Sequence, residues 1–161
     1  MRYALVYGLL SGTVIIAVIL AGMTLAPNSP IFSSVWFGYL VMFVAMTFIF
    51  VGVRRYRDLE KGGVIRFLPA LGMGLAIALV AVAAYVLIWE IYLAATHYAF
   101  IDKYFRGSDP EIVALREWYS NPLNRAWATA QELAPVGLIM ALFSAALLRN
   151  PRLLPAKRPA Q

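Results

Sequence analysis

Two acidic residues, Glu90 and Glu132, stand inside long apolar segments of the sequence. Inserting a charged side chain near the middle of a membrane costs about 2.5–3.5 kcal/mol, so such residues are candidates for function by default. Two carboxylates that share a site can hold a proton between them, attract a cation, or act as a general acid and base. We therefore expect the chemistry of this chain at these two positions.

Glu90 has aromatic neighbours that suit a cation site. Trp89 and Tyr92 could line such a site, because aromatic rings attract positive charge. His97 follows Glu90 by seven residues, so the two fall on the same face of a helix. We interpret His97 as a residue of the membrane interface, with a proton relay as the alternative.

Glu132 is preceded by polar residues on its own segment: Arg125 lies seven positions before it and Thr129 three. At ~1.5 Å per residue, Glu132 lies roughly 9 Å below the outer end of its segment, and Glu90 about 32 Å above the inner end of its own. Both acids then belong to the outer half of the membrane and could share one polar site if their helices are antiparallel neighbours. The alternative is structural: Glu90 in its protonated form bonds a neighbouring helix, and Glu132 pairs with Arg125.

The segments that carry these residues are too apolar for a water-soluble protein. Hydrophobic residues make up 62% of the chain and charged residues 14%, against roughly 45–50% and 25% in a soluble domain. The stretch 3–53 contains no charge, and Pro27 and Pro30 divide it, because proline stops helices. The sequence predicts an all-α, polytopic membrane protein. Its single membrane domain is a four-helix bundle with spans over residues 4–26, 31–53, 67–101 and 126–148.

Basic residues set the expected orientation of these spans, because cytoplasmic loops of membrane proteins are enriched in Lys and Arg. The loop 54–66, the tail 149–161 and Arg2 carry most of the basic residues, whereas acidic residues offset the basic ones in the loop 102–125. We therefore expect both termini in the cytoplasm and the loop 102–125 outside.

This outer loop carries a helix signal of its own. Asp109 can cap a helix that starts at Pro110, and Ile112, Leu115 and Tyr119 then recur at helical spacing. We expect a short amphipathic helix on the outer membrane interface, with a lid over a pocket as the alternative.

Small residues predict where helices approach closely. Gly8 and Gly12 form a GxxxG pattern, which lets two backbones pack tightly, either within the bundle or between protomers. Ala76 and Ala83 lie at seven-residue steps from Glu90, so we expect them to form a packing face on the same side of the helix.

The residue types exclude several classes of function. The chain has no Cys and one His, so disulfide scaffolds, thiol catalysis and iron–sulfur sites are excluded, and no metal or cofactor is expected. A single peripheral His also leaves nucleophilic catalysis unsupported. We assign the net charge of +6 to orientation and to contact with anionic lipid, and expect no nucleic-acid partner, because no helix has a basic face.

Five short motifs together resemble a known family. They are Tyr7-Gly8…Ser11-Gly12, Tyr56-Arg57-Asp58…Gly62-Gly63-Val64-Ile65…Phe67, Trp89-Glu90-Ile91-Tyr92, Asn121-Pro122-Leu123 and Glu132…Pro135-Val136-Gly137-Leu138. In this order and spacing, over nearly the whole chain, they resemble the bacterial membrane-protein family of domain of unknown function 4199. The resemblance implies a four-helix protein of the bacterial inner membrane with no established activity.

Three functions stay open. The first is a non-enzymatic accessory or structural membrane subunit, favoured because the loops are short and no catalytic set is present. Its partners would be the lipid bilayer and another membrane protein or a second copy of the chain. The second is a small oligomeric proton- or cation-coupled transporter in which Glu90, with Glu132, exchanges the ion. The third is an intramembrane enzyme that acts on lipid with the two acids as acid and base.

Overall fold

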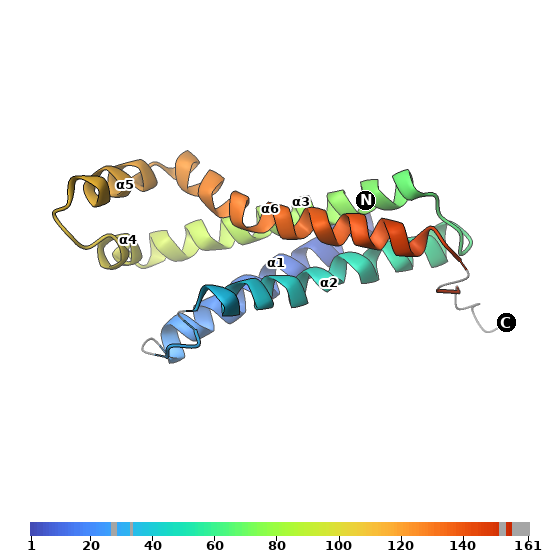
Figure 1. Ribbon diagram of the computed structural model, residues 1–161, viewed down its shortest axis with the longest axis horizontal. Coiled ribbons are helices and arrows are strands. Elements are labelled where there is room, and N and C mark those ends of the chain that lie inside the picture. The colour runs from blue at the N-terminus through green and yellow to red at the C-terminus, as the bar shows by residue number, and fades with distance from the viewer. Residues whose placement is uncertain (27–28, 33, 152–153, 156–161) are drawn as a thin grey trace.

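The computed structural model describes residues 1–26, 29–32, 34–151 and 154–155, and in this part of the chain it contains helices and no strand. Four helices are long and apolar enough to cross a membrane, which confirms the expected all-helical class (Figure 1). They are α1 (Arg2–Leu25), α2 (Val35–Glu60), α3 (Phe67–Ala95) and α6 (Pro122–Leu148), and two short helices, α4 (Ala99–Tyr104) and α5 (Pro110–Ser120), lie between α3 and α6.

The predicted third span, 67–101, is interrupted in the structure. Helix α3 ends at Ala95, and α4 begins at Ala99 after a sharp turn. His97 and Tyr98 in this turn have positive φ values of 49° and 58°, a left-handed conformation that a continuous α-helix does not contain. The apolar run gave no sign of this turn, because neither residue is a glycine or a proline.

Side-chain caps define the starts of the last two helices. The side chain of Asp109 accepts a hydrogen bond from the backbone N–H of Glu111, and Asn121 does the same for Leu123. Each cap is followed by a proline at the first helical position, where a missing N–H costs nothing. Within the loop 102–125, the residues of α5 are helical, and α6 starts at Pro122, before the predicted span boundary at 126.

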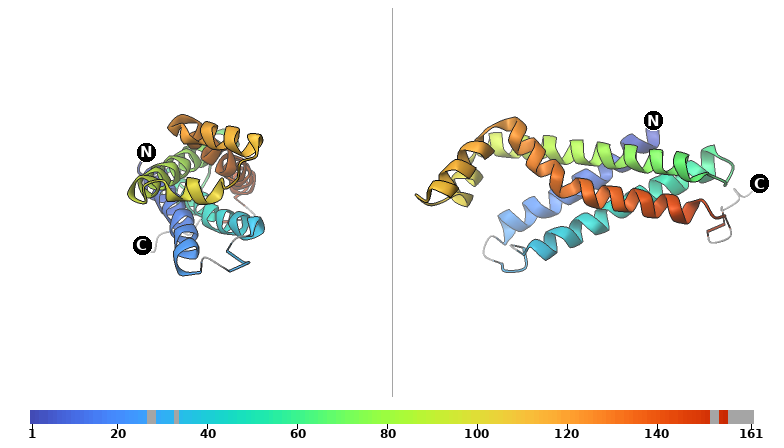
Figure 2. Two further views of the ribbon diagram at one scale, coloured as in Figure 1. Left: turned by 90° about the vertical axis from the view of Figure 1, so that its left-hand side faces the viewer. Right: turned by 45° about the horizontal axis from the view of Figure 1, so that its top comes forward.

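The four long helices contact one another in a ring, in the order α1, α3, α6, α2. The start of α1, the end of α6 and the α2–α3 loop lie at one end of this ring, which we call the basic end (Figures 1 and 2). At the other end, α1 and α2 diverge from α3 and α6, and α4 and α5 lie against the latter pair. We call this the splayed end.

Glycines allow α1 to pack directly on α3. A Cβ atom added at Gly8 would lie 2.5 Å from the Val80 Cβ, and one at Gly12 would lie 2.4 Å from the Ala81 carbonyl oxygen. Both distances are too short for any side chain, so the GxxxG pattern serves a helix contact within the chain.

The predicted alanine face of α3 is only partly correct. Ala76 is half-buried, but Ala83 is exposed, and Ala81 and Ala84 are buried in its place. A step of seven residues drifts by ~20° around a straight helix, so a face projected from Glu90 leaves the true contact stripe.

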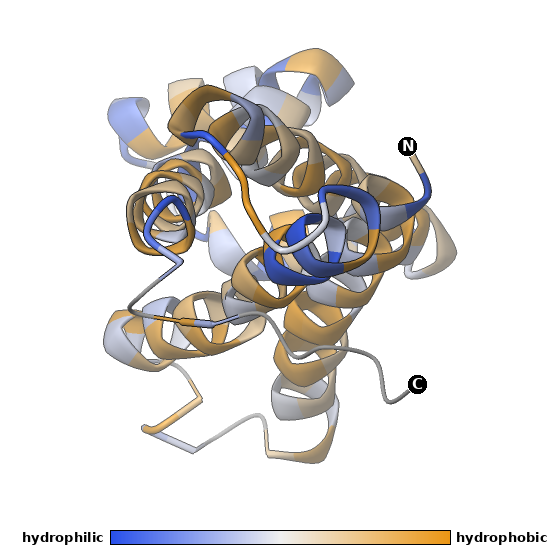
Figure 3. Ribbon diagram, turned by 90° about the vertical axis from the view of Figure 1, so that its right-hand side faces the viewer, coloured by the Kyte–Doolittle hydropathy of each residue, from blue (hydrophilic) through white to orange (hydrophobic). Residues whose placement is uncertain are grey.

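Ion pairs hold the basic end together. Arg57 is fully buried, and it donates hydrogen bonds to the Asp58 carboxylate and to the carbonyl oxygen of Leu154. Arg2 at the start of α1 pairs with Glu60 at the end of α2. Figure 3 looks onto this end and shows hydrophilic residues there around apolar helices.

Candidate functional site

Glu90 is paired with Arg125 near the splayed end. The guanidinium Nε and Nη2 atoms of Arg125 donate to the two carboxylate oxygens of Glu90 at 2.8 and 2.6 Å. The Nη1 atom donates to the backbone carbonyls of Tyr119 and Ser120, both at 3.1 Å. Arg125 is 1% exposed, so this fork-shaped contact joins α3, α5 and α6 inside the protein.

This pairing corrects two expectations for the polar site. The sequence left open that Glu90 and Glu132 share a site, and that Arg125 pairs with Glu132. In the structure, Arg125 reaches across to Glu90 on α3, and Glu132 lies on another part of α6. The physical reason is the position of each residue along its helix. Because α6 begins at Pro122, Arg125 lies at the start of α6, where it reaches Glu90 near the end of α3.

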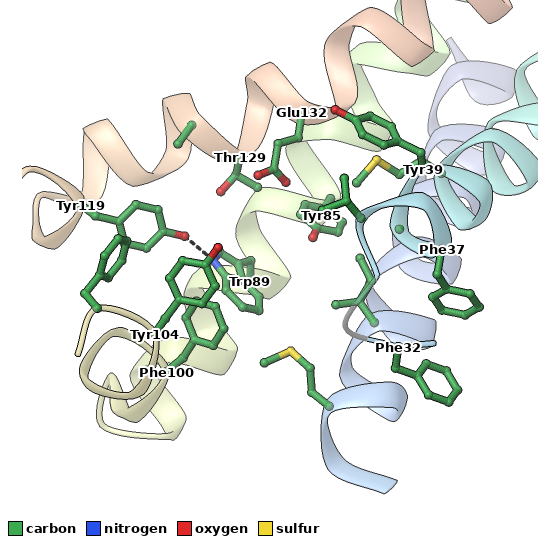
Figure 4. Close-up of a pocket in the computed structure, with 17 residues that line it drawn as sticks. Phe32, Phe37, Tyr39, Tyr85, Trp89, Phe100, Tyr104, Tyr119, Thr129 and Glu132 are labelled. Carbon is green, nitrogen blue, oxygen red and sulfur yellow. Dashed lines mark hydrogen bonds between the residues drawn. The ribbon is translucent and has the colours of Figure 1, made fainter. Parts of the chain in front are cut away.

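Glu132 instead lines a cavity of about 370 Å³ between the diverging helices (Figure 4). Its side chain points into the space between α6 and α3, beside Thr129 and Tyr85. Within the described part of the chain, Glu132 has no hydrogen bond or ion pair. The full lining consists of Ile19, Met23, Phe32, Val35, Phe37, Gly38, Tyr39, Met42, Tyr85, Trp89, Phe100, Tyr104, Phe105, Tyr119, Ala128, Thr129 and Glu132.

A continuous series of aromatic rings forms the wall of the cavity at the splayed end. The ring of Trp89 contacts that of Phe100 edge-on, with centroids 5.1 Å apart, and Phe100 stacks on Tyr104 at 5.3 Å. Phe105 then contacts Tyr104 and Tyr119. The series runs from α3 through α4 to α5, so it exists only because the chain turns back after Ala95.

Tyr119 closes this series with a hydrogen bond. The indole N–H of Trp89 donates to the Tyr119 hydroxyl oxygen at 3.4 Å, drawn as the dashed line in Figure 4. Burial is the main factor that raises the pKa of the Tyr119 phenol, so the phenol stays protonated at neutral pH. The hydroxyl of Tyr119 can therefore accept from Trp89 and still offer its own proton to the cavity.

The structure separates the other predicted site residues. Thr129 lines the cavity, and its hydroxyl donates to the Arg125 carbonyl at 2.8 Å. Tyr92 stacks on Trp89 at 5.6 Å from behind and does not line the cavity. His97 is exposed in the turn after α3, also outside the lining.

Sequence reasoning missed most of the aromatic lining. Phe100, Tyr104 and Phe105 come from the region that the sequence treated as the end of a span and the start of a loop, whereas Tyr119 belongs to the short helix for which a lid over a pocket was the alternative. The four-residue spacing of Phe100 and Tyr104 was a usable signal, because it places both rings on one face of a helical turn.

A smaller cavity of about 290 Å³ lies on the other side of Arg125, bordered by Tyr98, Asp102 and Arg116. The Arg125 guanidinium stacks over the Tyr98 ring at 5.3 Å, and Arg116 pairs with Asp102. The charges around this cavity are thus paired within the protein. Among the described residues, no group of three His, Cys, Asp or Glu side chains is placed to hold a metal ion.

Comparison with known proteins agrees with the motifs in the sequence. No curated protein and no solved structure matches the chain. A family model described as "Protein of unknown function (DUF4199)" matches residues 2–150, which is nearly the whole chain and confirms the resemblance. The chain therefore belongs to the protein family of unknown function DUF4199.

Proposed function

We propose that this chain is a non-enzymatic accessory membrane protein that binds a small, largely apolar molecule in the cavity at the splayed end. The observation that carries the proposal is the unpaired carboxylate of Glu132 within an aromatic cavity of about 370 Å³. Ligand sites in proteins are usually preformed cavities of about 300–1,000 Å³, mostly apolar, with a few polar groups that orient the ligand.

The packing below the cavity supports binding over an open passage. Towards the basic end, Ile49, Ile77 and Ala141 have no exposed surface. Gly74 approaches Ala141 so closely that an added Cβ would lie 2.9 Å from the Ala141 Cβ. A molecule in the cavity would meet this packed layer and leave by the side from which it entered.

The surroundings of the two acids support a role without catalysis. Glu90 is held by Arg125, so its carboxylate is engaged in structure. Glu132 has no second acid and no histidine beside it among the residues that line the cavity. The other polar groups of the lining are the hydroxyls of Thr129 and four tyrosines and the indole N–H of Trp89, so the lining lacks the pair of carboxylates that the enzyme hypothesis requires.

The orientation belongs to the same proposal. We place the basic end in the cytoplasm and the splayed end outside, in a bacterial inner membrane, because Arg2 and the basic residues of the loop 54–66 lie at the end where α1 starts and α6 ends. The long helices present apolar side chains outward, which suits lipid, another membrane protein or a second copy as neighbours.

Transport is the second candidate, and the structure changes which residue it would use. Because Glu90 is paired and Glu132 is unpaired, Glu132 is the better group to exchange a proton or cation. Transport predicts that Glu132→Gln abolishes ion-coupled flux in proteoliposomes. Accessory binding predicts that there is no coupled flux to abolish.

The binding function can be tested because the chain has no native Cys. Ala128 lines the cavity one helical turn from Glu132, whereas Ala134 faces outward on the same helix. We would label Ala128→Cys and Ala134→Cys with neutral methyl methanethiosulfonate in nanodiscs, with and without the neutral probe tert-butylbenzene. The proposal expects the probe to slow labelling at position 128 and not at 134. Equal rates with and without the probe at both positions would reject it.

A further inference from the structure

The cavity has an unbalanced charge. Its lining includes one carboxylate, Glu132, and no Lys, Arg or His. Arg125, on the same helix as Glu132, directs its guanidinium to Glu90 and to two backbone carbonyls. Glu132 lines the cavity and is itself exposed, and the lining provides no cation to balance its carboxylate.

The other residues of the lining suit an organic cation that has apolar groups around its charge. Nine of the residues that line the cavity are aromatic, and aromatic faces attract cations most strongly where water is displaced. They are Phe32, Phe37, Tyr39, Tyr85, Trp89, Phe100, Tyr104, Phe105 and Tyr119. Figure 4 shows that they come from both sides of the gap, with the rings of Phe32 and Phe37 turned away from Glu132.

The donor set argues against a small metal cation as the occupant. Calcium takes 6–8 oxygen ligands and magnesium keeps an octahedral shell. Here the charged oxygens belong to Glu132 alone, and the other side-chain oxygens of the lining are neutral hydroxyls of Thr and Tyr. An organic ammonium or phosphonium ion has no such coordination requirement, and its apolar groups fill space that a metal ion would leave empty.

We infer that the cavity selects a lipophilic organic monocation over a neutral molecule of the same shape, with Glu132 as its counter-ion. The inference rests on the binding function proposed above and adds the chemical class of the ligand. The Glu132 carboxylate neutralises the cation, the aromatic rings solvate it, and the side chains of Ile19 and Met23 on α1 contact its apolar part.

A pair of probes with one shape and different charge tests the inference. Phenyltrimethylammonium is a cation, and tert-butylbenzene is its neutral isostere. Both would be titrated against the labelling of Ala128→Cys by methyl methanethiosulfonate, in nanodiscs of zwitterionic phosphatidylcholine that do not attract cations themselves. The concentration that halves the labelling rate is measured for each probe.

Glu132→Gln is the decisive variant. It removes the charge and keeps the size of the side chain. We expect it to raise the half-protecting concentration of phenyltrimethylammonium by about tenfold or more and to leave that of tert-butylbenzene unchanged. Glu117→Gln removes the same charge from the exposed face of α5 and should change neither value. Glu132→Asp should retain the cation preference.

The outcomes separate this inference from the binding function. If phenyltrimethylammonium protects Ala128→Cys equally with and without the Glu132 carboxylate, the inference is wrong and the binding function stands. If tert-butylbenzene does not protect position 128, the binding function is wrong and the inference falls with it. If tert-butylbenzene still protects position 128 in the Glu132→Gln variant, the cavity of that variant is folded. If the Glu132→Gln protein does not accumulate, Glu132→Ala is used in its place.

Discussion

At the basic end, the long helices contact one another through glycine and alanine, and little space remains between them. At the splayed end, α1 and α2 separate from α3 and α6, and aromatic side chains take the place of helix contacts. The two ends also differ in how their charged side chains are paired. At the basic end, the buried Arg57 forms an ion pair with Asp58, whereas Glu132 in the cavity has no such pair among the described residues. One end of the molecule is thus closely packed, and the other contains the cavity for which we propose a ligand.

The largest effect is expected at the splayed end, at the Glu90–Arg125 pair. Glu90→Gln would leave the buried Arg125 without its counter-ion, and breaking a buried pair from one side costs about 3–5 kcal/mol. The free energy of unfolding in mixed micelles measures this loss. Adding Arg125→Gln to Glu90→Gln should recover part of it.

An exposed ion pair supplies the control for that prediction. Arg116 pairs with Asp102 on the surface, with about half of each side chain or more accessible. Arg116→Gln should change the free energy of unfolding by less than about 1 kcal/mol. Equal losses for Glu90→Gln and Arg116→Gln would show that the Glu90–Arg125 pair is not a buried structural link.

The next effect concerns the packed helices. Gly12→Leu would force α1 away from Ala81 on α3, and overpacking of this kind costs roughly 1–3 kcal/mol. Gly72→Leu on α3 is the matched control, because a Cβ there meets no atom within 4 Å. Thermal unfolding in detergent should show a lower midpoint for Gly12→Leu only. A normal midpoint for Gly12→Leu would mean that α1 does not pack on α3 through this face.

A substitution in the cavity is expected to change stability less, but to change clearly how fast a thiol reagent reaches the cavity. Ala128→Trp would fill part of the space beside Glu132, and Ala134→Trp places the same ring on the outward face. With Gly38→Cys as the reporter on the opposite wall, Ala128→Trp should slow labelling several-fold. If Ala134→Trp slows it as much, the reporter is sensing lipid and not the cavity.

The smallest effect is a pH dependence at α5. Burial raises the pKa of Tyr119, so the docked helix keeps the phenol proton at a pH where the undocked helix loses it. Docking should therefore be unaffected below the ordinary tyrosine pKa of about 10 and weaken above it. Hydrogen exchange of the α5 amides measures docking, and Tyr119→Phe should remove the alkaline weakening. An unchanged alkaline weakening in Tyr119→Phe would assign it to another group.

The helices of this protein were predictable from its sequence because each depends on local information. The uncharged run 3–53, its proline break, and the caps at Asp109 and Asn121 all act within a few residues. The turn after Ala95 was not predictable in this way, because His97 and Tyr98 adopt left-handed conformations without a glycine signal.

The site was only partly predictable, because its geometry depends on how helices are offset along one another. Sequence spacing alone allowed Arg125 to pair with either Glu90 or Glu132. The offset of α6 along α3 places Arg125 beside Glu90. The aromatic wall depends on the same kind of information: Phe100 and Tyr104 reach Trp89 because α4 folds back. Residue types identified Glu132 as a candidate, and its unpaired state emerged from the arrangement of the helices.

The most direct test of the account is the charge preference of the cavity itself. Ala128→Cys would be labelled with two reagents of similar size, one carrying a trimethylammonium group and one a sulfonate, and the ratio of the two rates compared with that at Ala134→Cys. The account predicts that the cationic reagent is favoured at position 128 beyond its ratio at 134, and that Glu132→Gln removes the excess. The same ratio at both positions, unchanged by Glu132→Gln, would contradict it.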